Sequence, residues 1–124
     1  MDKTEKNISV LEHIIKWCAE IPELHKEFND SYDTFKAGGS YFKSVAMNLL
    51  QIGELINNLS KDFQEKYSHI PYAGIVSLRN VIAHGYGTLE AEKLWIISHK
   101  DTIELQKQCT NIISEMKISN RDDN

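Results

Sequence analysis

The stretch YFKSVAMNLLQIGELINNLS, residues 41–60, decides the fold class. Its apolar residues recur every three or four positions, and the stripe consists of Phe42, Val45, Ala46, Leu49, Gly53 and Ile56. Because an α-helix turns once in about 3.6 residues, this spacing places them on one face of a helix that ends near Leu59 and Ser60. The same period runs through nearly the whole chain, and no alternating pattern of a strand competes with it. The sequence therefore predicts an all-α protein.

An earlier helix is predicted from the same spacing in the residues Ile8, Leu11, Ile14, Ile15 and Cys18. Ser9 and Glu12 have the spacing of a capping box, which satisfies free amides at a helix start. Pro22 is expected to end or restart this helix, because proline has no amide hydrogen to donate. The segment NDSYDTFKAGGS, residues 29–40, has the turn formers and the paired glycines of a loop.

The second half of the chain predicts a short helix and two longer ones. Residues 61–72 form the short helix and a connection, with Pro71 at the start of the next helix. That helix carries the apolar residues of 75–82 and is expected to stop at Gly85 or Gly87, where glycine accepts a left-handed conformation.

A last helix is expected to continue to about Met116, with a kink near residues 99–101. Thr88 is its predicted cap, and Glu90 and Glu92 favour its first turn. We therefore predict one domain over residues 1–118, a four- to five-helix antiparallel bundle, followed by a polar tail, residues 119–124.

Composition places the chain among soluble globular proteins. It has 124 residues, of which 41% are hydrophobic and 26% are charged. The apolar runs are too short for a membrane span, and the N-terminus lacks the apolar core of a signal peptide, so a cytoplasmic location is expected. Cys18 and Cys109 have neither a C-x-x-C spacing nor a secretory context, which predicts two buried free thiols.

The charge balance argues against broad binding of nucleic acids. The formal net charge is −4, whereas non-specific binding to DNA or RNA normally needs a basic surface. Only two of the fourteen basic residues are arginines, Arg79 and Arg121, and Arg121 belongs to the polar tail. Arg79 thus supplies the one guanidinium expected in the folded body, a group suited to phosphate or carboxylate.

Polar residues gather around the end of the third long helix, in RNVIAHGYG, residues 79–87. Asn80 and His84 are four residues apart and therefore share a helix face. Glu54 places a carboxylate in an apolar neighbourhood, where it needs a partner such as Arg79 or Asn80. Structural roles explain the same residues: a histidine that caps carbonyls, an arginine in an ion pair, and a tyrosine packed in a turn.

No metal site is predicted. The other histidines are assigned structural roles because they have no H-E-x-x-H or comparable ligand spacing, and they are His13, His25, His69 and His99. Trp17 and Trp95 fit the edges of a core better than a base-stacking surface.

Taken together, these motifs resemble the motifs of HepT-like toxins, which belong to the HEPN superfamily. Arg79-Asn80-x-x-x-His84-x-Tyr86 is similar to the family's R-x4-H-x-Y motif, and IGELINNLS at 52–60 is similar to its Gly-Glu helix. The resemblance covers about residues 41–113. The chain departs from the family pattern at Tyr72, where a Trp commonly follows the proline.

The resemblance implies a homodimeric, metal-independent endoribonuclease without a cofactor. His84 would act as acid or base and Arg79 as phosphate clamp, because RNA supplies its own nucleophile and needs proton transfer and stabilisation of charge. Asn80 would orient these groups by hydrogen bonding, and Glu54 would hold Arg79.

The resemblance also implies regulation through Tyr86. The partner would be a minimal nucleotidyltransferase antitoxin, which uses ATP to attach AMP to this tyrosine and silences the toxin. Two other functions stay open. The chain is alternatively a non-catalytic module that binds a nucleotide or the transferase, or an antitoxin-like regulator that restrains an active transferase.

Overall fold

The computed structural model describes residues 2–85 and 90–122, with side chains as far as Ser119. These residues form helices and contain no strand, so the predicted all-α class is confirmed. Along the chain, the helices are α1 (Lys3–Glu27), α2 (Tyr32–Lys36), α3 (Ser40–Asn57), α4 (Lys61–Lys66), α5 (Tyr72–His84), α6 (Ala91–Ile96), the π-helical turn η2 (Ile97–Asp101) and α7 (Thr102–Asp122).

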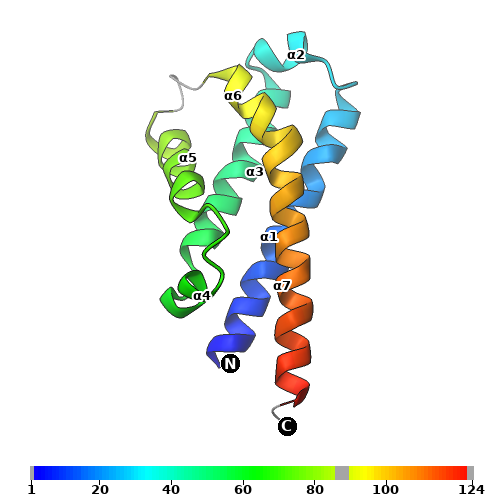
Figure 1. Ribbon diagram of the computed structural model, residues 1–124. Helices are drawn as coiled ribbons and strands as arrows, with labels where there is room; N and C mark the ends of the chain where they lie inside the picture. Colours follow the sequence, from blue (N-terminus) through cyan, green and yellow to red (C-terminus); the bar gives the residue numbers. More distant parts are fainter. Residues whose placement is uncertain (1, 86–89, 123–124) are drawn as a thin grey trace.

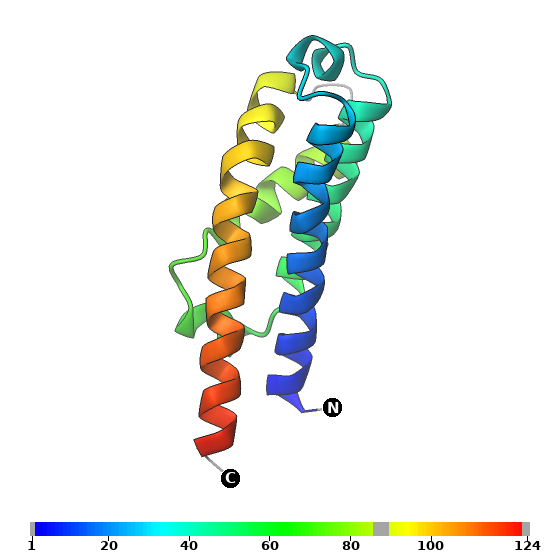
Figure 2. The same ribbon diagram turned by 90° about the vertical axis from the view of Figure 1, so that its right-hand side faces the viewer.

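The long helices run alternately up and down, as predicted for an antiparallel bundle (Figure 1). Helix α1 packs against both α3 and α7, and α3 also packs against α5. Figure 2 shows α1 and α7 side by side along most of their length, with both chain termini at the same end. The short α2 closes the opposite end, where the buried Phe35 contacts Trp95 of α6 at a ring distance of 5.2 Å.

Helix α1 begins earlier and runs further than the sequence predicted. Asp2 caps it by accepting a 2.8 Å hydrogen bond from the amide of Glu5, so Ser9 lies inside the helix and does not form a capping box. Pro22 is also inside the helix. Ile21 directly before it and His25 three residues after it are buried, and their packing offsets the one amide hydrogen bond that proline removes.

The remaining boundaries are close to the predicted ones, with four differences. The predicted loop 29–40 contains the helix α2. Helix α5 ends at Gly85, but the φ of this residue is −134°, which lies outside the left-handed region. Glu90 is the N-cap of α6, and the predicted cap Thr88 lies outside the described residues. Helix α7 continues to Asp122 because no proline or glycine interrupts residues 119–122, so the predicted tail begins as helix.

The predicted irregularity near residues 99–101 is the wider turn η2. A π-helical turn inserts one extra residue into a helix, and it rotates the faces of α6 and α7 relative to each other. The predicted free thiols are also confirmed, since Cys18 and Cys109 are buried and unbridged. Within the described residues, none of the helices combines the length and apolar character needed to cross a bilayer.

Candidate functional site

Helix α5 carries the polar motif and has an unusually exposed position in the bundle. Only Ile82 is buried among its residues, and its principal packing partner is α3. Asn80 and His84 are exposed, and their spacing of four residues places them on one face of the helix. The end of α5 thus presents both groups to the solvent.

Arg79 points from α5 toward α3 and is held there by two residues. Its Nε and Nη2 atoms donate to Glu54 Oε1, and its Nη1 atom donates to Asn80 Oδ1 at 2.8 Å. The ion pair with Glu54 is therefore as predicted. The predicted burial of the carboxylate is wrong, because the Glu54 side chain is 42% exposed and the Arg79 side chain 29% exposed. Glu54 lies where α3 meets the solvent, one residue beyond the close contact with α5.

The close contact is made by Gly53, which has no side chain to keep the helices apart. A Cβ atom built at position 53 would lie 3.0 Å from Cγ of Arg79 and still closer to its Cβ. Carbon atoms do not approach to such distances, so only glycine allows Arg79 to lie directly over α3 here. The Gly-Glu pair of the sequence therefore has two functions, to admit Arg79 and to bind its guanidinium.

His84 differs from Arg79 in its contacts with the part of the chain that the structure describes. Among the described residues, none forms a hydrogen bond or ion pair with its imidazole. The end of the helix is satisfied instead by the amide of Gly85, which donates to the carbonyl of Val81 at 2.7 Å. Among the described residues, a capping role for His84 therefore has no support. Tyr86 lies outside the described residues.

Comparison with known proteins identifies the family. The family model for Ribonuclease HepT-like proteins matches residues 10–112. The chain belongs to the HepT-like ribonuclease family. This HepT-like chain is 31% identical over 107 residues to the protein named "Putative RNase TTE0752" of Caldanaerobacter subterraneus, which covers 86% of the chain and 94% of that protein. No solved structure matches the chain.

Two archaeal relatives of the HepT-like chain come from Methanocaldococcus jannaschii. "Putative RNase MJ1216" is 28% identical over 111 residues, which is 90% of this chain and 88% of the relative. "Gamma-glutamylcyclotransferase and putative RNase MJ0434" is 28% identical over 106 residues, and the match spans 47% of its length. The names of these relatives thus describe ribonucleases.

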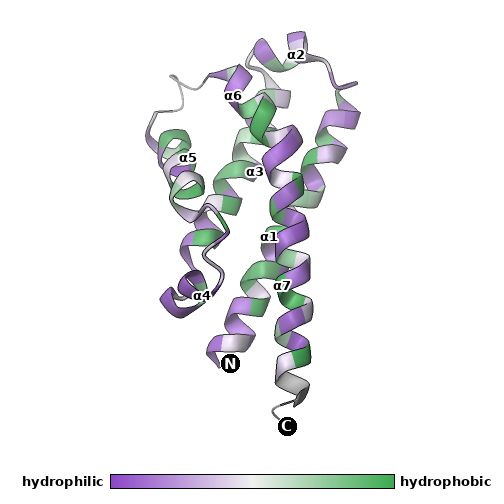
Figure 3. Ribbon diagram, viewed as in Figure 1, coloured by the Kyte–Doolittle hydropathy of each residue, from purple (hydrophilic) through white to green (hydrophobic). Residues whose placement is uncertain are grey.

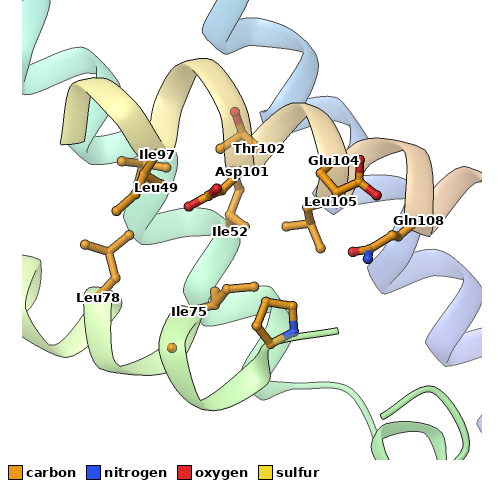
Figure 4. A pocket seen from close by; sticks show the side chains of 12 residues that line it. Leu49, Ile52, Ile75, Leu78, Ile97, Asp101, Thr102, Glu104, Leu105 and Gln108 are labelled. Carbon is orange, nitrogen blue, oxygen red and sulfur yellow. The ribbon is translucent and has the colours of Figure 1, made fainter. Parts of the chain in front are cut away.

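A hollow of about 390 Å³ lies between α3, α5 and the segment from η2 to α7. Apolar side chains of α3 and α5 point into it, among them Leu49, Ile52 and Leu78 (Figure 4). Its charged lining residues are both acidic, Asp101 and Glu104. Because phosphate groups would be repelled by these carboxylates, this hollow is poorly suited to an RNA backbone.

The structure also brings together two histidines and an aspartate that lie far apart in the sequence. His25 and His99 stack with ring centroids 3.7 Å apart, and Asp30 lies beside them. Burial is the main reason why the pKa of His25 is lowered to about 4, with a further contribution from His99, while Asp30 acts in the opposite direction. The separation of 69 residues between Asp30 and His99 left no local signal in the sequence.

Proposed function

We propose that this HepT-like protein is the toxin of a toxin–antitoxin pair, a cytoplasmic endoribonuclease that acts as a homodimer without a metal ion. The observation that carries the proposal is the exposed His84 imidazole, which none of the described residues engages. It stands on the same helix as an arginine that is already oriented by Glu54 and Asn80.

These groups match the needs of RNA cleavage by the 2′-hydroxyl. One group removes the proton of the hydroxyl, another protonates the leaving 5′-oxygen, and histidine serves in either role near neutral pH. The transition state places negative charge on phosphorus-bound oxygens, which a preoriented guanidinium stabilises. One chain supplies one such histidine, and two chains would supply both.

The distribution of charge supports an approach of RNA to α3 and α5. The chain has eighteen acidic residues, but only Glu54 lies in either of these helices. Lys43 and Arg79 lie in the same pair of helices. The net charge of −4 therefore reflects acidic side chains elsewhere in the chain, and a phosphate backbone meets little repulsion from α3 and α5 themselves.

The same surface is suited to a second copy of the chain. Met47 of α3 and Val81 of α5 are 51% and 43% exposed, beside a shallow hollow that is also lined by Leu50 and Ile82. Exposed apolar side chains that gather in this way are typical of protein interfaces. A dimer formed here would bring two copies of α5, and with them two copies of the motif, together.

The proposal is tested with the purified chain and an end-labelled RNA in the presence of EDTA. We expect cleavage that leaves a 2′,3′-cyclic phosphate or its opened product. The His84→Ala variant should be slower by a factor of about 10²–10⁴, the usual contribution of one proton-transfer group. His13→Ala is the matched control, because His13 is an exposed histidine of α1 and should be dispensable.

Three outcomes would contradict this function. Cleavage that requires Mg²⁺ and leaves 5′-phosphates would show a different chemistry. Full activity of His84→Ala would remove the proposed acid or base. If no RNA is cut while both variants still bind a nucleotidyltransferase, the chain is a non-catalytic module or a regulator of that enzyme.

Regulation through Tyr86 is the second part of the proposal. Transfer of AMP from ATP to the phenol oxygen, with release of diphosphate, would add one phosphate that carries adenosine two residues after His84. The added negative charge would compete with RNA for Arg79. Coexpression with a minimal nucleotidyltransferase should raise the intact mass by one AMP or more, and a Tyr86→Phe chain that gains the same mass would rule out this site.

A further inference from the structure

A cluster of His25, Asp30 and His99 lies away from α5, at the end of the bundle that α2 closes. His25 belongs to the last turn of α1, Asp30 to the connection toward α2, and His99 to the π-helical turn η2. One ligand atom from each residue lies within 4.8 Å of the other two. Three separate segments thus meet through groups that bind metal ions.

The hydrogen bonds of His99 define where its proton lies. Its Nδ1 atom is 2.7 Å from the carbonyl oxygen of Trp95, which only accepts hydrogen bonds, so Nδ1 carries the hydrogen. Its Nε2 atom is 2.7 Å from Asp30 Oδ1. In a neutral ring, Nε2 would direct a lone pair at a carboxylate oxygen. A positive species therefore belongs at this position, either a second ring proton or a metal ion.

His25 is fixed in a similar way through Ser98. The hydroxyl of Ser98 donates to the carbonyl of Trp95 at 3.0 Å, and it therefore accepts from His25 Nε2 at 3.1 Å. The lone pair of His25 is then on Nδ1, which accepts from the Tyr41 hydroxyl and lies 4.0 Å from Asp30 Oδ1. The carbonyl of Trp95 thus determines the tautomers of both histidines, as outer hydrogen bonds commonly do at metal sites.

We propose that His25 Nδ1, His99 Nε2 and the Asp30 carboxylate bind a divalent transition-metal ion, with Zn²⁺ as the best fit. Two imidazole nitrogens and one carboxylate oxygen form a donor set that zinc accepts at about 2.0–2.2 Å. Such bonds place ligand atoms about 3.2–3.6 Å apart in a tetrahedral arrangement. Asp30 Oδ1 lies 2.7 Å from His99 Nε2, which is closer than this range, and 4.0 Å from His25 Nδ1, which is further than this range.

Binding requires movements of side chains, which are freest at the exposed His99 and Asp30, because Tyr41 and His25 are buried. The two rings stack with an angle of 22° between their planes, so the His99 ring turns out of the stack for both lone pairs to converge. Tyr41 releases Nδ1 of His25 at the same time. The side chains of His99 and Asp30 are 32% and 62% exposed, which gives the ion access. The bound ion would tie α1 and the connection to α2 to η2, a structural role separate from cleavage by α5.

The test uses tag-free chain stripped of metal with a chelator and then titrated with ZnCl₂ by calorimetry. We expect one equivalent of Zn²⁺ per chain and a rise in the unfolding temperature. Asp30→Asn removes a ligand at an exposed position and should weaken binding by more than about 100-fold, since loss of an outer partner alone costs about 10–100-fold. Ser98→Ala removes the hydroxyl that fixes the proton of His25 on Nε2, and it should weaken binding by about 10–100-fold.

His13→Ala is the matched control. The Nδ1 atom of His13 lies 2.7 Å from the carbonyl four residues earlier, as in His99, but no carboxylate of the described residues faces its ring. This variant and His84→Ala should bind Zn²⁺ as the natural chain does. Mg²⁺ should not bind, because it prefers oxygen ligands.

Less than one equivalent of Zn²⁺, or an affinity that Asp30→Asn leaves unchanged, would overturn the proposal. The site would then hold a second proton on His99, as an ion pair with Asp30. These results are independent of the RNA assay in EDTA, so a failure of either proposal leaves the other intact.

Discussion

Arg79 depends on the absence of a side chain at position 53. Its ion pair with Glu54 is partly exposed, and exposed ion pairs contribute only about 0–1 kcal/mol to stability. The pair therefore matters more for the orientation of the guanidinium than for the free energy of unfolding. The close approach of α5 to α3 at Gly53 makes this orientation possible.

Gly53→Ala should push α5 away from α3, because the new methyl group overlaps the Arg79 side chain. We expect the free energy of unfolding to fall by about 1–3 kcal/mol, as in other overpacked sites, and RNA cleavage to fall with it. Urea unfolding and the cleavage assay measure the two effects.

Gly74→Ala is the control for this substitution. A Cβ atom at position 74 would meet no atom within 4 Å, and alanine favours the helix. Its stability should rise by about 0.5–1 kcal/mol. A Gly53→Ala chain that gains stability in the same way would show that the helices are not in close contact.

At the scale of elements, the contact between α1 and α7 buries both thiols. Burial raises the pKa of Cys109 to about 12, and burial together with Cys109 raises that of Cys18 to about 12. The thiols of the folded chain are therefore neutral at any ordinary pH. In the unfolded chain they ionise near their usual value of about 8.5.

This difference predicts a loss of stability at alkaline pH. The folded pKa is the higher one, so the contribution is fully present below about pH 8.5 and is lost as the pH rises toward 12. We expect both thiols to resist a thiol reagent at pH 8 in the native state and to react after denaturation. Rapid labelling of the native chain would contradict the packing of α1 on α7. A chain with Cys18→Ala and Cys109→Ala should show a smaller alkaline decline.

At the scale of the whole molecule, the helices α5 and α7 differ in hydropathy. Figure 3 shows α5 largely in apolar and neutral colours, whereas polar colours recur along α7. With one buried residue, α5 is weakly covered by the chain itself. An apolar helix that carries the motif and has little cover is the expected position of a second chain.

Val81→Glu should prevent the proposed dimer by placing a charge among exposed apolar side chains. Light scattering at about 10 μM should give twice the chain mass of 14.3 kDa for the natural chain and a single mass for the variant. The variant should also lose RNA cleavage, because each chain keeps only its own His84. Ile118→Glu is the control, since Ile118 is 59% exposed near the end of α7 and should not affect the mass. If the natural chain has the mass of one chain in this measurement, the proposed dimer is wrong.

The sequence by itself determined the helical class, most helix boundaries and the two candidate partners of Glu54, of which the structure selects Arg79. The helices follow from apolar patterns within one or two turns. The candidate partners of Glu54 follow from two motifs considered together, the Gly-Glu helix at 52–60 and the polar stretch at 79–87. The signals that failed were also local ones. Ser9 and Pro22 carry the marks of a helix start and a helix end, but α1 already begins after the Asp2 cap and continues past Pro22, where Ile21 and His25 are buried.

Only the tertiary structure decided which distant groups meet. It joined His25, Asp30 and His99, exposed Glu54, and placed α5 against α3 so that Arg79 meets Glu54. The physical reason is that hydrophobic burial selects the packing of the helices without regard to the polar side chains they carry. Contacts between those side chains then depend on helix rotation and on turns such as η2, which no local pattern in the sequence encodes.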